Sequence, residues 1–211
     1  MNDTLTESPL DLDRIRRALR SHTPQLLGPY ARRRAAVATI LRDAGGGPEL
    51  LLIERARRTG DPWSGQMGFP GGKLEPGDDS LQAAAIRETE EEVGLRLDST
   101  EQLGQLDDQE GRHAGRPVGL IVSSFVYAVD TEPRLSAGDE VAEAMWIPLA
   151  VLLDPARHVE HRHHLDPERV YPGIRVTDSS RHVVWGMTYR FLDVFFRILG
   201  ETLPESRAEA G

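Results

Sequence analysis

The sequence predicts a single α/β domain in which helices cover both faces of a mixed β-sheet. Its 211 residues fit one ordinary domain with appendages better than two full domains. A hydrophobic fraction of 39% is enough to fill a core, and a charged fraction of 28% is typical of a globular protein in water. Strand patterns mixed with a few helical patterns along the chain favour an α/β sandwich.

The first half of the predicted domain is a helix followed by a β-hairpin. Residues 12–20 have the amphipathic pattern of a short helix. After a linker rich in proline and glycine, residues 35–41 and 49–55 read as strands. The glycine-rich turn at 44–48 joins them, so we expect the two strands to pair as a hairpin.

The second half of the predicted domain alternates strands with two helices. Strands are expected at 103–107, 119–129 and 144–147, and helices at 149–153 and 188–199. The last helix has one polar stripe and is otherwise apolar, so it must pack on the sheet or on a partner, which allows a homodimer. The chain therefore divides into an N-terminal helix and linker (1–34), the main domain (35–200) and a disordered tail (201–211).

The composition excludes several classes of function. The formal net charge is −9, and an acidic chain lacks the basic face that nucleic acid binding requires. No apolar run is long enough to span a membrane and the first residues do not resemble a secretory signal, so we expect a cytoplasmic protein. The chain has no cysteine, which excludes disulfides, a thiolate nucleophile and cysteine-ligated zinc. A small phosphorylated ligand can still bind where metal ions bridge the like charges.

The segment from Phe69 to Leu95 holds the strongest indication of function. It begins with the pair Gly71-Gly72, continues through an acidic turn and becomes a helix that ends at Gly94. This helix is expected to begin near Asp79 or Ser80, and Asp79 followed three residues later by Gln82 resembles a capping box. Paired glycines let the backbone approach a ligand closely, so the loop and the helix together predict a binding site.

The glutamates of this helix do not all face the same way. At about 100° per residue, Glu88, Glu91 and Glu92 fall within an arc of about 100°, whereas Glu90 points almost opposite. Three carboxylates on one face repel one another unless a cation lies among them. Mg²⁺ or Mn²⁺ is expected there, because hard cations take carboxylate oxygens and keep positions open for phosphate and water. Considered alone, the helix could simply present an acidic surface to solvent. The adjacent glycine loop favours the metal site over this alternative.

This pattern resembles the signature of the Nudix hydrolase superfamily, a glycine and an acid followed by Arg-Glu-aliphatic-x-Glu-Glu-x-Gly-aliphatic. Here the second half reads RETEEEVGL, from Arg87 to Leu95. Asp78 or Asp79 replaces the usual first glutamate with one extra residue before Arg87, and Thr89 replaces an aliphatic residue. The aspartate and the extra residue are similar to the coenzyme A pyrophosphatase branch of the superfamily.

The resemblance to this branch extends over residues 35–199. It includes the loop at 64–72, the acidic residues 139–141 before the strand 145–148, and the start of the last helix at 184–188. Asp61 stands where the branch carries an arginine, and Arg57 or Arg58 would take its place. The resemblance implies a Nudix-type α/β/α sandwich with a mixed sheet.

The resemblance also implies a reaction and roles for individual residues. The reaction is hydrolysis of a nucleoside diphosphate linked to another group, and coenzyme A or an acyl-coenzyme A would yield 3′,5′-ADP and (acyl-)4′-phosphopantetheine. By this resemblance the metal ligands are Gly72, Glu88, Glu91 and Glu92, the catalytic residues are Glu88, Glu140 and Arg87, and Arg55, Arg57, Arg58 and Gly71 bind substrate. Either Glu88 or Glu140 takes the proton from water, while Arg87 orients a carboxylate. Alternatively, Glu140 is an ordinary acidic residue in a solvent-exposed turn. The arginines, in the same way, would form only a basic edge exposed to solvent.

Histidines and tryptophans outside this segment are further candidate functional residues. We interpret the histidine-rich sequence RHVEHRHHLDP as part of a mobile surface loop. Its histidines are His158, His161, His163 and His164. A zinc or copper site, or a lid over the pocket, is the alternative for them. Trp63 and Trp185 either stack on an adenine or fill the edge of the core.

Two alternatives to coenzyme A hydrolysis stay open. One is the same reaction on ADP-ribose, NADH or another nucleotide, and the other is a nucleotide-sensing regulator that keeps the fold without catalysis. The complete set of Glu88, Glu91 and Glu92 argues against the regulator. Isoprenoid diphosphate isomerases share this fold but use a cysteine, and the chain has none.

The helix geometry predicts opposite effects for two neighbouring substitutions. Glu92→Gln should abolish turnover because it removes a metal ligand, whereas Glu90→Gln should be nearly silent because that side chain points away. Turnover of a nucleotide substrate with Mg²⁺ measures both. Equal losses in the two variants would contradict the assignment of the helix faces.

Overall fold

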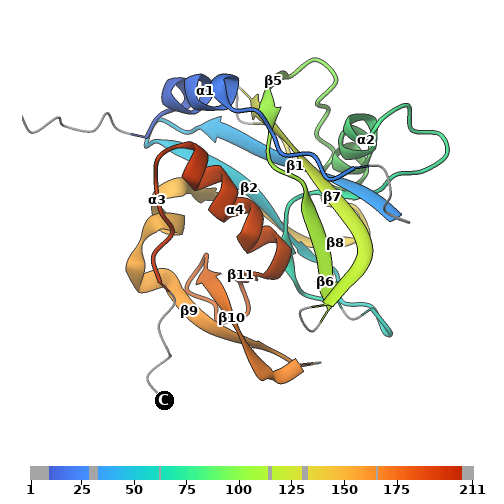
Figure 1. Cartoon of the computed structure of the whole chain (residues 1–211), viewed down its shortest axis with the longest axis vertical. Helices are drawn as coiled ribbons and strands as arrows, with labels where there is room; N and C mark the ends of the chain where they lie inside the picture. Colours follow the sequence, from blue (N-terminus) through green and yellow to red (C-terminus); the bar gives the residue numbers. More distant parts are fainter. Residues whose placement is uncertain are drawn as a thin grey trace, which may run out of the picture.

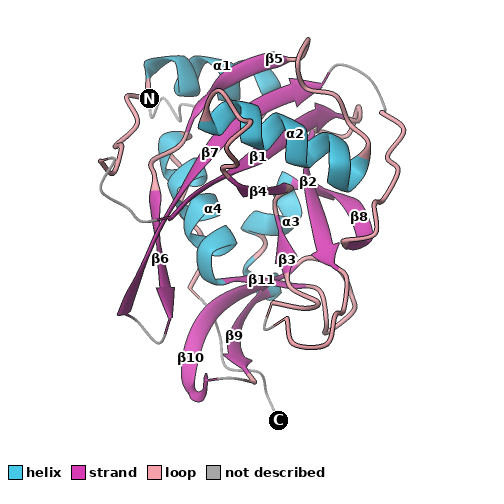
Figure 2. Ribbon diagram, turned by 90° about the vertical axis from the view of Figure 1, so that its right-hand side faces the viewer, coloured by secondary structure: helices cyan, strands magenta, loops and turns pink. Residues whose placement is uncertain are grey.

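The computed structural model describes residues 10–28, 33–61, 63–113, 116–129, 133–164 and 166–205. A large mixed sheet lies between helices, and a smaller sheet lies beside it (Figures 1 and 2). The helices are α1 (Leu12–Ser21), α2 (Leu81–Val93), α3 (Leu149–Leu153) and α4 (Gly186–Ile198), with a 3-10 turn at Pro155–Arg157. The strands are β1 (Arg33–Asp43), β2 (Pro48–Arg55), β3 (Met67–Gly68), β4 (Gly71–Lys73), β5 (Glu101–Gln105), β6 (Gln109–His113), β7 (Arg116–Val129), β8 (Val141–Pro148), β9 (His158–His163), β10 (Asp166–Arg175) and β11 (Val183–Trp185).

Strand β1 is the centre of the large sheet. It pairs antiparallel with β2 and parallel with β7, and its first half also pairs antiparallel with the short strand β4. The order β3-β2-β1-β7-β5 is extended by β6 on β7 and β8 on β2, while β11, β10 and β9 form the smaller sheet. The predicted mixed α/β architecture is therefore confirmed.

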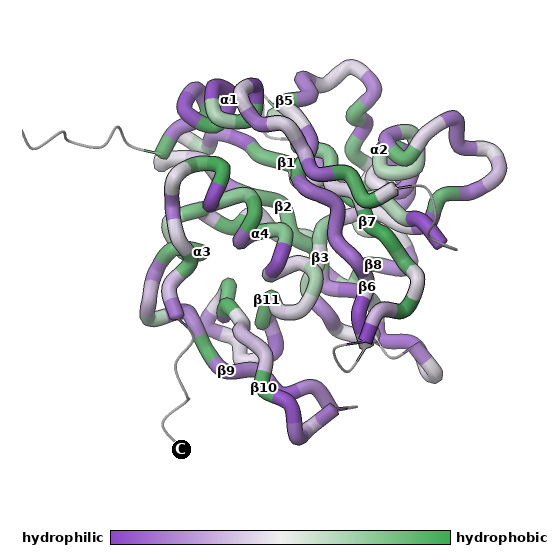
Figure 3. Tube along the Cα trace, viewed as in Figure 1, coloured by the Kyte–Doolittle hydropathy of each residue, from purple (hydrophilic) through white to green (hydrophobic). Residues whose placement is uncertain are grey.

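The two faces of the large sheet carry separate hydrophobic cores, because successive side chains of a strand point to opposite faces. Core residues on the α2 face include Ala36, Ala38, Ile40, Leu51, Ile53, Ala85 and Val93. Core residues on the other face include Ala35, Leu41, Leu50, Leu52, Ile15, Leu19, Phe191 and Phe195. Strands β1 and β2 are consequently apolar on both sides, while β6 and the far end of the β9–β10 hairpin are hydrophilic (Figure 3).

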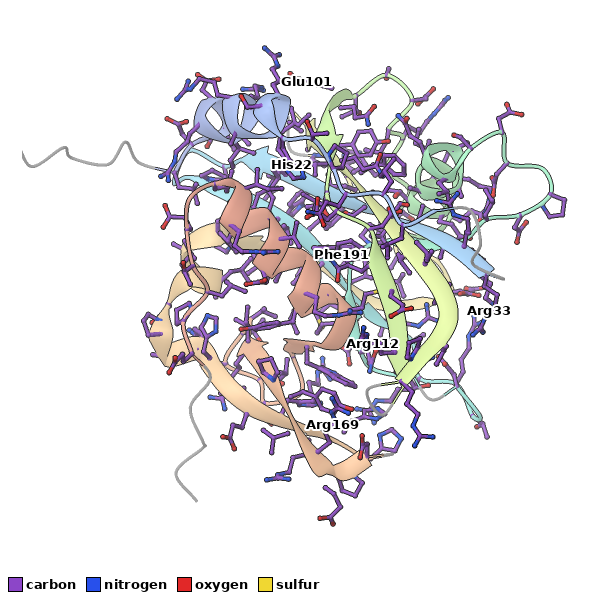
Figure 4. All side chains as sticks on the ribbon, in the orientation of Figure 1. His22, Arg33, Glu101, Arg112, Arg169 and Phe191 are labelled. Atoms are coloured by element: carbon purple, nitrogen blue, oxygen red, sulfur yellow. The ribbon has the colours of Figure 1, made fainter. Side chains whose placement is uncertain are left out.

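Helix α4 covers the sheet face opposite α2. Phe191 on α4 is 1% exposed, and Phe195 and Phe196 are fully buried (Figure 4). The apolar surface of the last predicted helix therefore packs within this chain. A homodimer stays a prediction.

Helix α1 packs on the same face of the sheet as α4 and is tied to the neighbouring strand β5. Ile15 and Leu19 of α1 belong to the core that contains Phe191. At the surface, Arg16 binds Glu101 at 2.9 Å, and Glu101 lies beside α1 in Figure 4. The predicted N-terminal helix is thus an integral part of the fold.

Most elements predicted from the sequence are present, with three corrections. The segment 158–164 is not a mobile surface loop, because 158–163 form strand β9, in which His158 and Val159 are buried. The expected disordered tail starts too early, since Leu203 is 7% exposed and Glu201 pairs with Arg14 at 2.8 Å. Residues 206–211 lie outside the described part of the chain. The third correction is a set of strands that the sequence did not predict, because their polar, glycine-containing or very short sequences lack a clear strand pattern. These strands are β3, β4, β6, β10 and β11.

Helix α2 starts at the second of the two predicted positions, and the capping box predicted from Asp79 does not form. The N-cap residue is Ser80, whose side chain accepts a hydrogen bond from the Ala83 amide at 3.0 Å. Asp79 is exposed and lies outside the helix. The helix ends at Gly94, as predicted, with φ of 69° in the left-handed region that glycine adopts without strain.

No helix in the described part of the chain is long and apolar enough to cross a membrane.

The identity of the N-cap can be tested by a matched pair of substitutions. Ser80→Ala should lower the free energy of unfolding by about 1 kcal/mol, because the Ala83 amide loses its partner. Asp79→Ala should have little effect, because the predicted cap at Asp79 does not form. Urea denaturation of both variants distinguishes them, and a larger loss for Asp79→Ala would contradict the structure.

Candidate metal centre

The glycine pair lies directly against the backbone of β1 and the carboxylates of α2. Gly71 and Gly72 pair with Val37 and Ala36 of β1. Gly71 has φ of 147°, and a Cβ there would lie 2.3 Å from the Ala36 carbonyl oxygen. A Cβ on Gly72 would lie 2.3 Å from the carboxyl carbon of Glu88. Only glycine therefore permits this close approach of the loop to the helix.

Glu92 is the most buried carboxylate of the site. It is 4% exposed and accepts a hydrogen bond from the Gly71 amide at 2.9 Å. Burial raises its pKa from 4.5 to about 7, and the negative charges of Glu88 and Glu140 add to the rise. The Gly71 hydrogen bond and the positive charge of Arg55 oppose it. Without a cation the site thus favours a proton on Glu92.

Arg87 joins the remaining acidic groups. Its Nε and Nη2 form a fork with the two oxygens of Asp78, at 3.0 and 3.1 Å. Its Nη1 reaches Glu88 at 3.0 Å and Glu91 at 3.2 Å. The hydrogen bond from Arg87 lowers the pKa of Asp78, whereas burial raises the pKa of Glu88. One guanidinium therefore fixes the directions of three carboxylates.

The structure brings together the three predicted helix carboxylates and separates the fourth. Glu88 lies against Gly72, Glu92 is bonded to Gly71, and Glu91 shares Arg87 with Glu88. Glu90 is exposed, 3.7 Å from Arg96 on the outer surface. Of the two aspartates considered from the sequence, Asp78 joins the site through Arg87.

Thr89 replaces an aliphatic residue of the family signature and is fully buried. Its hydroxyl donates to the Ala85 carbonyl at 2.7 Å, one turn earlier in the same helix. The buried hydroxyl thus has a hydrogen-bond partner, so the threonine at this position leaves the helix face intact.

A loop at 133–140 brings Glu140 to the end of α2. The Gly138 amide donates to the Glu92 carbonyl at 2.9 Å, and the Ala56 amide donates to the Glu140 carbonyl at 2.8 Å. The Glu140 carboxylate accepts a hydrogen bond from Arg58 at 2.9 Å. The negative charge of Glu140 adds to the rise in the pKa of Glu92.

The three predicted substrate-binding arginines have different surroundings. Arg58 is paired with Glu140, and Arg55 lies 3.6 Å from Asp61. Arg57 is exposed, and its guanidinium would lie 3.7 Å from a Cβ placed on Gly65; within the described ranges it forms no ion pair. Asp61 therefore forms an ion pair with Arg55.

The donors of the site fit a hard divalent cation. Glu88, Glu91 and Glu92 together with the Gly72 carbonyl offer only oxygen atoms, which Mg²⁺ and Mn²⁺ take in preference to nitrogen or sulfur. Burial is the main cause of the raised pKa of Glu92, and the negative charges of Glu88 and Glu140 add to it. A bound cation would balance these charges.

The histidines of β9 form an aromatic cluster with Trp185. The rings of His161 and His163 each lie 4.8 Å from the Trp185 ring, and Trp63 stacks on His163 at 6.1 Å. Burial lowers the pKa of His161, and the neighbouring His163 adds to this effect. The side chains on this hairpin therefore pack on one another as well as facing solvent.

A second acidic group lies outside the predicted site. Glu54, Glu143 and His182 place one ligand atom each within 4.8 Å of one another. Sequence reasoning missed this group because its members are far apart in the chain and none belongs to a motif.

The fold and the glycine–carboxylate contact agree with the class of Nudix domains. The model of the NUDIX domain matches residues 32–168, so the chain belongs to the NUDIX family. It is 34% identical over 189 residues to NudL of Citrobacter koseri, described as an uncharacterized Nudix hydrolase, across 87% of this chain and 92% of that protein. NudL of Cronobacter sakazakii is 33% identical over the same shares. The predicted family is confirmed, and the coenzyme A branch stays a prediction.

Solved structures agree with the fold. A MutT/nudix family protein from Enterococcus faecalis superposes with a TM-score of 0.52 and 20% identity, covering 84% of this chain and 64% of that one. This likeness supports the architecture alone.

The raised pKa of Glu92 predicts a pH dependence of stability. A carboxyl group whose pKa is higher in the folded than in the unfolded chain destabilises the fold as pH rises through that window, here from 4.5 to about 7. Metal-free protein should therefore lose more stability between about pH 5 and about pH 8 than Glu92→Gln does. Urea denaturation with a chelator present measures this, with Glu90→Gln as the control. Parallel profiles for wild type and Glu92→Gln would contradict the assignment.

Proposed function

We propose that this protein hydrolyses a nucleoside diphosphate linked to another group, with coenzyme A or an acyl-coenzyme A as the preferred substrate. One observation carries the proposal, the close contact of Gly71-Gly72 with the carboxylates of Glu88 and Glu92. This contact holds the backbone of the loop against two carboxylates of α2. Family membership supports the reaction class, and the irregular first half of the signature supports the substrate.

Glu88, Glu91, Glu92 and the Gly72 carbonyl would hold Mg²⁺ or Mn²⁺ in this proposal. The ion, when bound, neutralises charge on the phosphate oxygens and makes a water molecule more acidic. The protein itself holds the carboxylates in place against their mutual repulsion. Arg87 does this through Asp78, Glu88 and Glu91, which makes it a positioning residue.

The general base is proposed to be Glu88 or Glu140. Glu88 is half-buried beside the glycine loop with a raised pKa, which favours proton uptake. Glu140 is exposed and its carboxylate is bound to Arg58 at 2.9 Å. Arg58 would have to release Glu140 before this carboxylate could accept a proton from water.

The substrate's 3′-phosphate is assigned to the arginines between β2 and β3. Arg55 and Arg58 are engaged by Asp61 and Glu140, so Arg57 is the guanidinium best placed to accept a new anion. A guanidinium binds phosphate through two parallel hydrogen bonds. Trp63, which is 43% exposed, offers a ring on which adenine could stack.

Hydrolysis of ADP-ribose, NADH or another nucleotide is the second candidate. The ion pair between Arg55 and Asp61 favours it, because it replaces a cation that the coenzyme A branch carries at that point.

A turnover screen tests the reaction class and the substrate together. Coenzyme A, ADP-ribose, NADH and dinucleoside polyphosphates are incubated with Mg²⁺ or Mn²⁺, and the products are identified by mass. We expect 3′,5′-ADP and 4′-phosphopantetheine to form fastest. No hydrolysis of any substrate with either metal would favour the non-catalytic regulator.

The role of Arg57 can be tested with a substrate that lacks the 3′-phosphate. Arg57→Ala should raise KM for coenzyme A about tenfold or more and leave dephospho-coenzyme A nearly unchanged, because only the former loses a charged contact. Arg116→Ala, at the exposed start of β7, is the control. Equal effects on both substrates would place the 3′-phosphate elsewhere.

A further inference from the structure

The group formed by Glu54, Glu143 and His182 lies on the sheet face opposite α2. Ile53 on β2 belongs to the core under α2, and Leu52 belongs to the core under α4. Because side chains alternate along a strand, Glu54 shares the face of Leu52. Glu143 stands opposite Glu54 on β8, and His182 precedes β11 of the smaller sheet. The group therefore joins the two sheets and is separate from the glycine–carboxylate site.

The spacing of its ligand atoms is close to that of a metal coordination sphere, with all three atoms within 4.8 Å of one another. His182 Nε2 lies 3.4 Å from Glu54 Oε2 and 3.7 Å from Glu143 Oε2. Ligands of a tetrahedral ion at bond lengths of about 2.0–2.2 Å are roughly 3.3–3.6 Å apart. These distances are too long for direct hydrogen bonds of good geometry and fit atoms that share an ion.

Glu54 is a buried carboxylate whose nearest partners are the side chains of His182 and Arg181. It is 3% exposed, and within the described ranges no donor forms a hydrogen bond to its carboxylate. The nearest cation, Arg181, has its Nη2 3.6 Å from Glu54 Oε2. An ionised carboxyl group at such a position normally has hydrogen-bond donors or a metal as partner. Glu54 therefore calls for a further ligand.

The tautomer of His182 is fixed by contacts on both ring nitrogens. Nε2 accepts a hydrogen bond from Arg181 Nε at 2.9 Å, so it carries a lone pair and no proton. Nδ1 consequently carries the proton and donates to Thr177 Oγ1 at 2.8 Å. A histidine whose second nitrogen is held by an oxygen in this way presents its lone pair as metal ligands do.

We propose that Glu54, Glu143 and His182 bind a divalent ion of the zinc class, with Arg181 as its competitor. The imidazole nitrogen favours Zn²⁺ or another late transition metal over Mg²⁺, which prefers oxygen alone. Arg181 is 56% exposed at its side chain and has its Nη2 3.3 Å from Glu143, so it can turn outward when an ion takes its place. The rival explanation is an ion-pair network in which Arg181 alone neutralises the two glutamates.

The ion would link the large sheet to the smaller one. Glu54 and Glu143 are on β2 and β8, and His182 leads into β11, which is followed directly by α4. Binding at this point should stabilise the docking of the smaller sheet. This inference does not depend on which substrate the glycine–carboxylate site hydrolyses.

Titration with Co²⁺, a coloured substitute for Zn²⁺, tests the proposal. The full chain is stripped with a chelator and saturated with Mg²⁺ to fill the oxygen site, and Co²⁺ binding is followed by visible absorption. We expect one Co²⁺ with tetrahedral absorption, and its affinity should fall at least about tenfold in Glu143→Gln and in His182→Gln. Glu160→Gln, an exposed glutamate on β9, should bind like wild type.

Removal of Arg181 separates the two explanations. Arg181→Ala should tighten Co²⁺ binding by about tenfold or more if the arginine competes with the ion. Unchanged or weaker binding in Arg181→Ala would contradict its role as competitor. Absence of tetrahedral absorption in wild type and Arg181→Ala alike, or binding that Glu143→Gln and His182→Gln both leave intact, would overturn the proposed site. Glu143 is exposed, so this variant should fold even where His182→Gln does not.

Discussion

The close contact between the glycine loop and the carboxylates of α2 is the constraint on which the site depends. A Cβ on Gly72 would occupy the place of the Glu88 carboxyl group, and the Gly71 amide is bonded to Glu92. The contact concentrates negative charge in a partly buried place, where carboxylates repel one another strongly. Arg87 relieves part of this repulsion, and a divalent cation would relieve the rest. The glycine loop, helix α2 and the loop at 133–140 all surround this concentration of negative charge.

The large sheet separates two regions of different chemistry. Its α2 face carries oxygen donors suited to Mg²⁺ or Mn²⁺, and its other face carries Glu54, Glu143 and His182, which include a nitrogen donor. Alternation along β2 makes this possible, because Glu54 and Arg55 are neighbours in sequence and lie on opposite faces. Arg55 acts on Glu92, while Glu54 faces the smaller sheet. One strand thus contributes to both regions.

Sequence reasoning predicted what depends on short spacings. The separation of Glu90 from Glu88, Glu91 and Glu92 follows from helical periodicity alone, and the stop at Gly94 follows from its conformational freedom. It left the start of this helix open between Asp79 and Ser80 because Asp and Ser cap equally well, and in the structure the N-cap is Ser80. It could not foresee contacts between distant segments, such as Arg58 with Glu140 or Glu54 with His182. Strand β9 was predicted as a loop because its histidines and arginine give no alternating strand pattern. Its buried residues are His158 and Val159.

The most direct test of the central claim is Mn²⁺ binding to Gly72→Ala, measured by electron paramagnetic resonance of the free ion. The added methyl group would displace the Glu88 carboxylate, so the affinity should fall at least about tenfold. Gly77→Ala is the matched control, because a Cβ there meets nothing within 4 Å. Both variants should keep the circular dichroism of the wild type. Wild-type Mn²⁺ affinity in folded Gly72→Ala would contradict the claim that the loop and Glu88 build the metal site together.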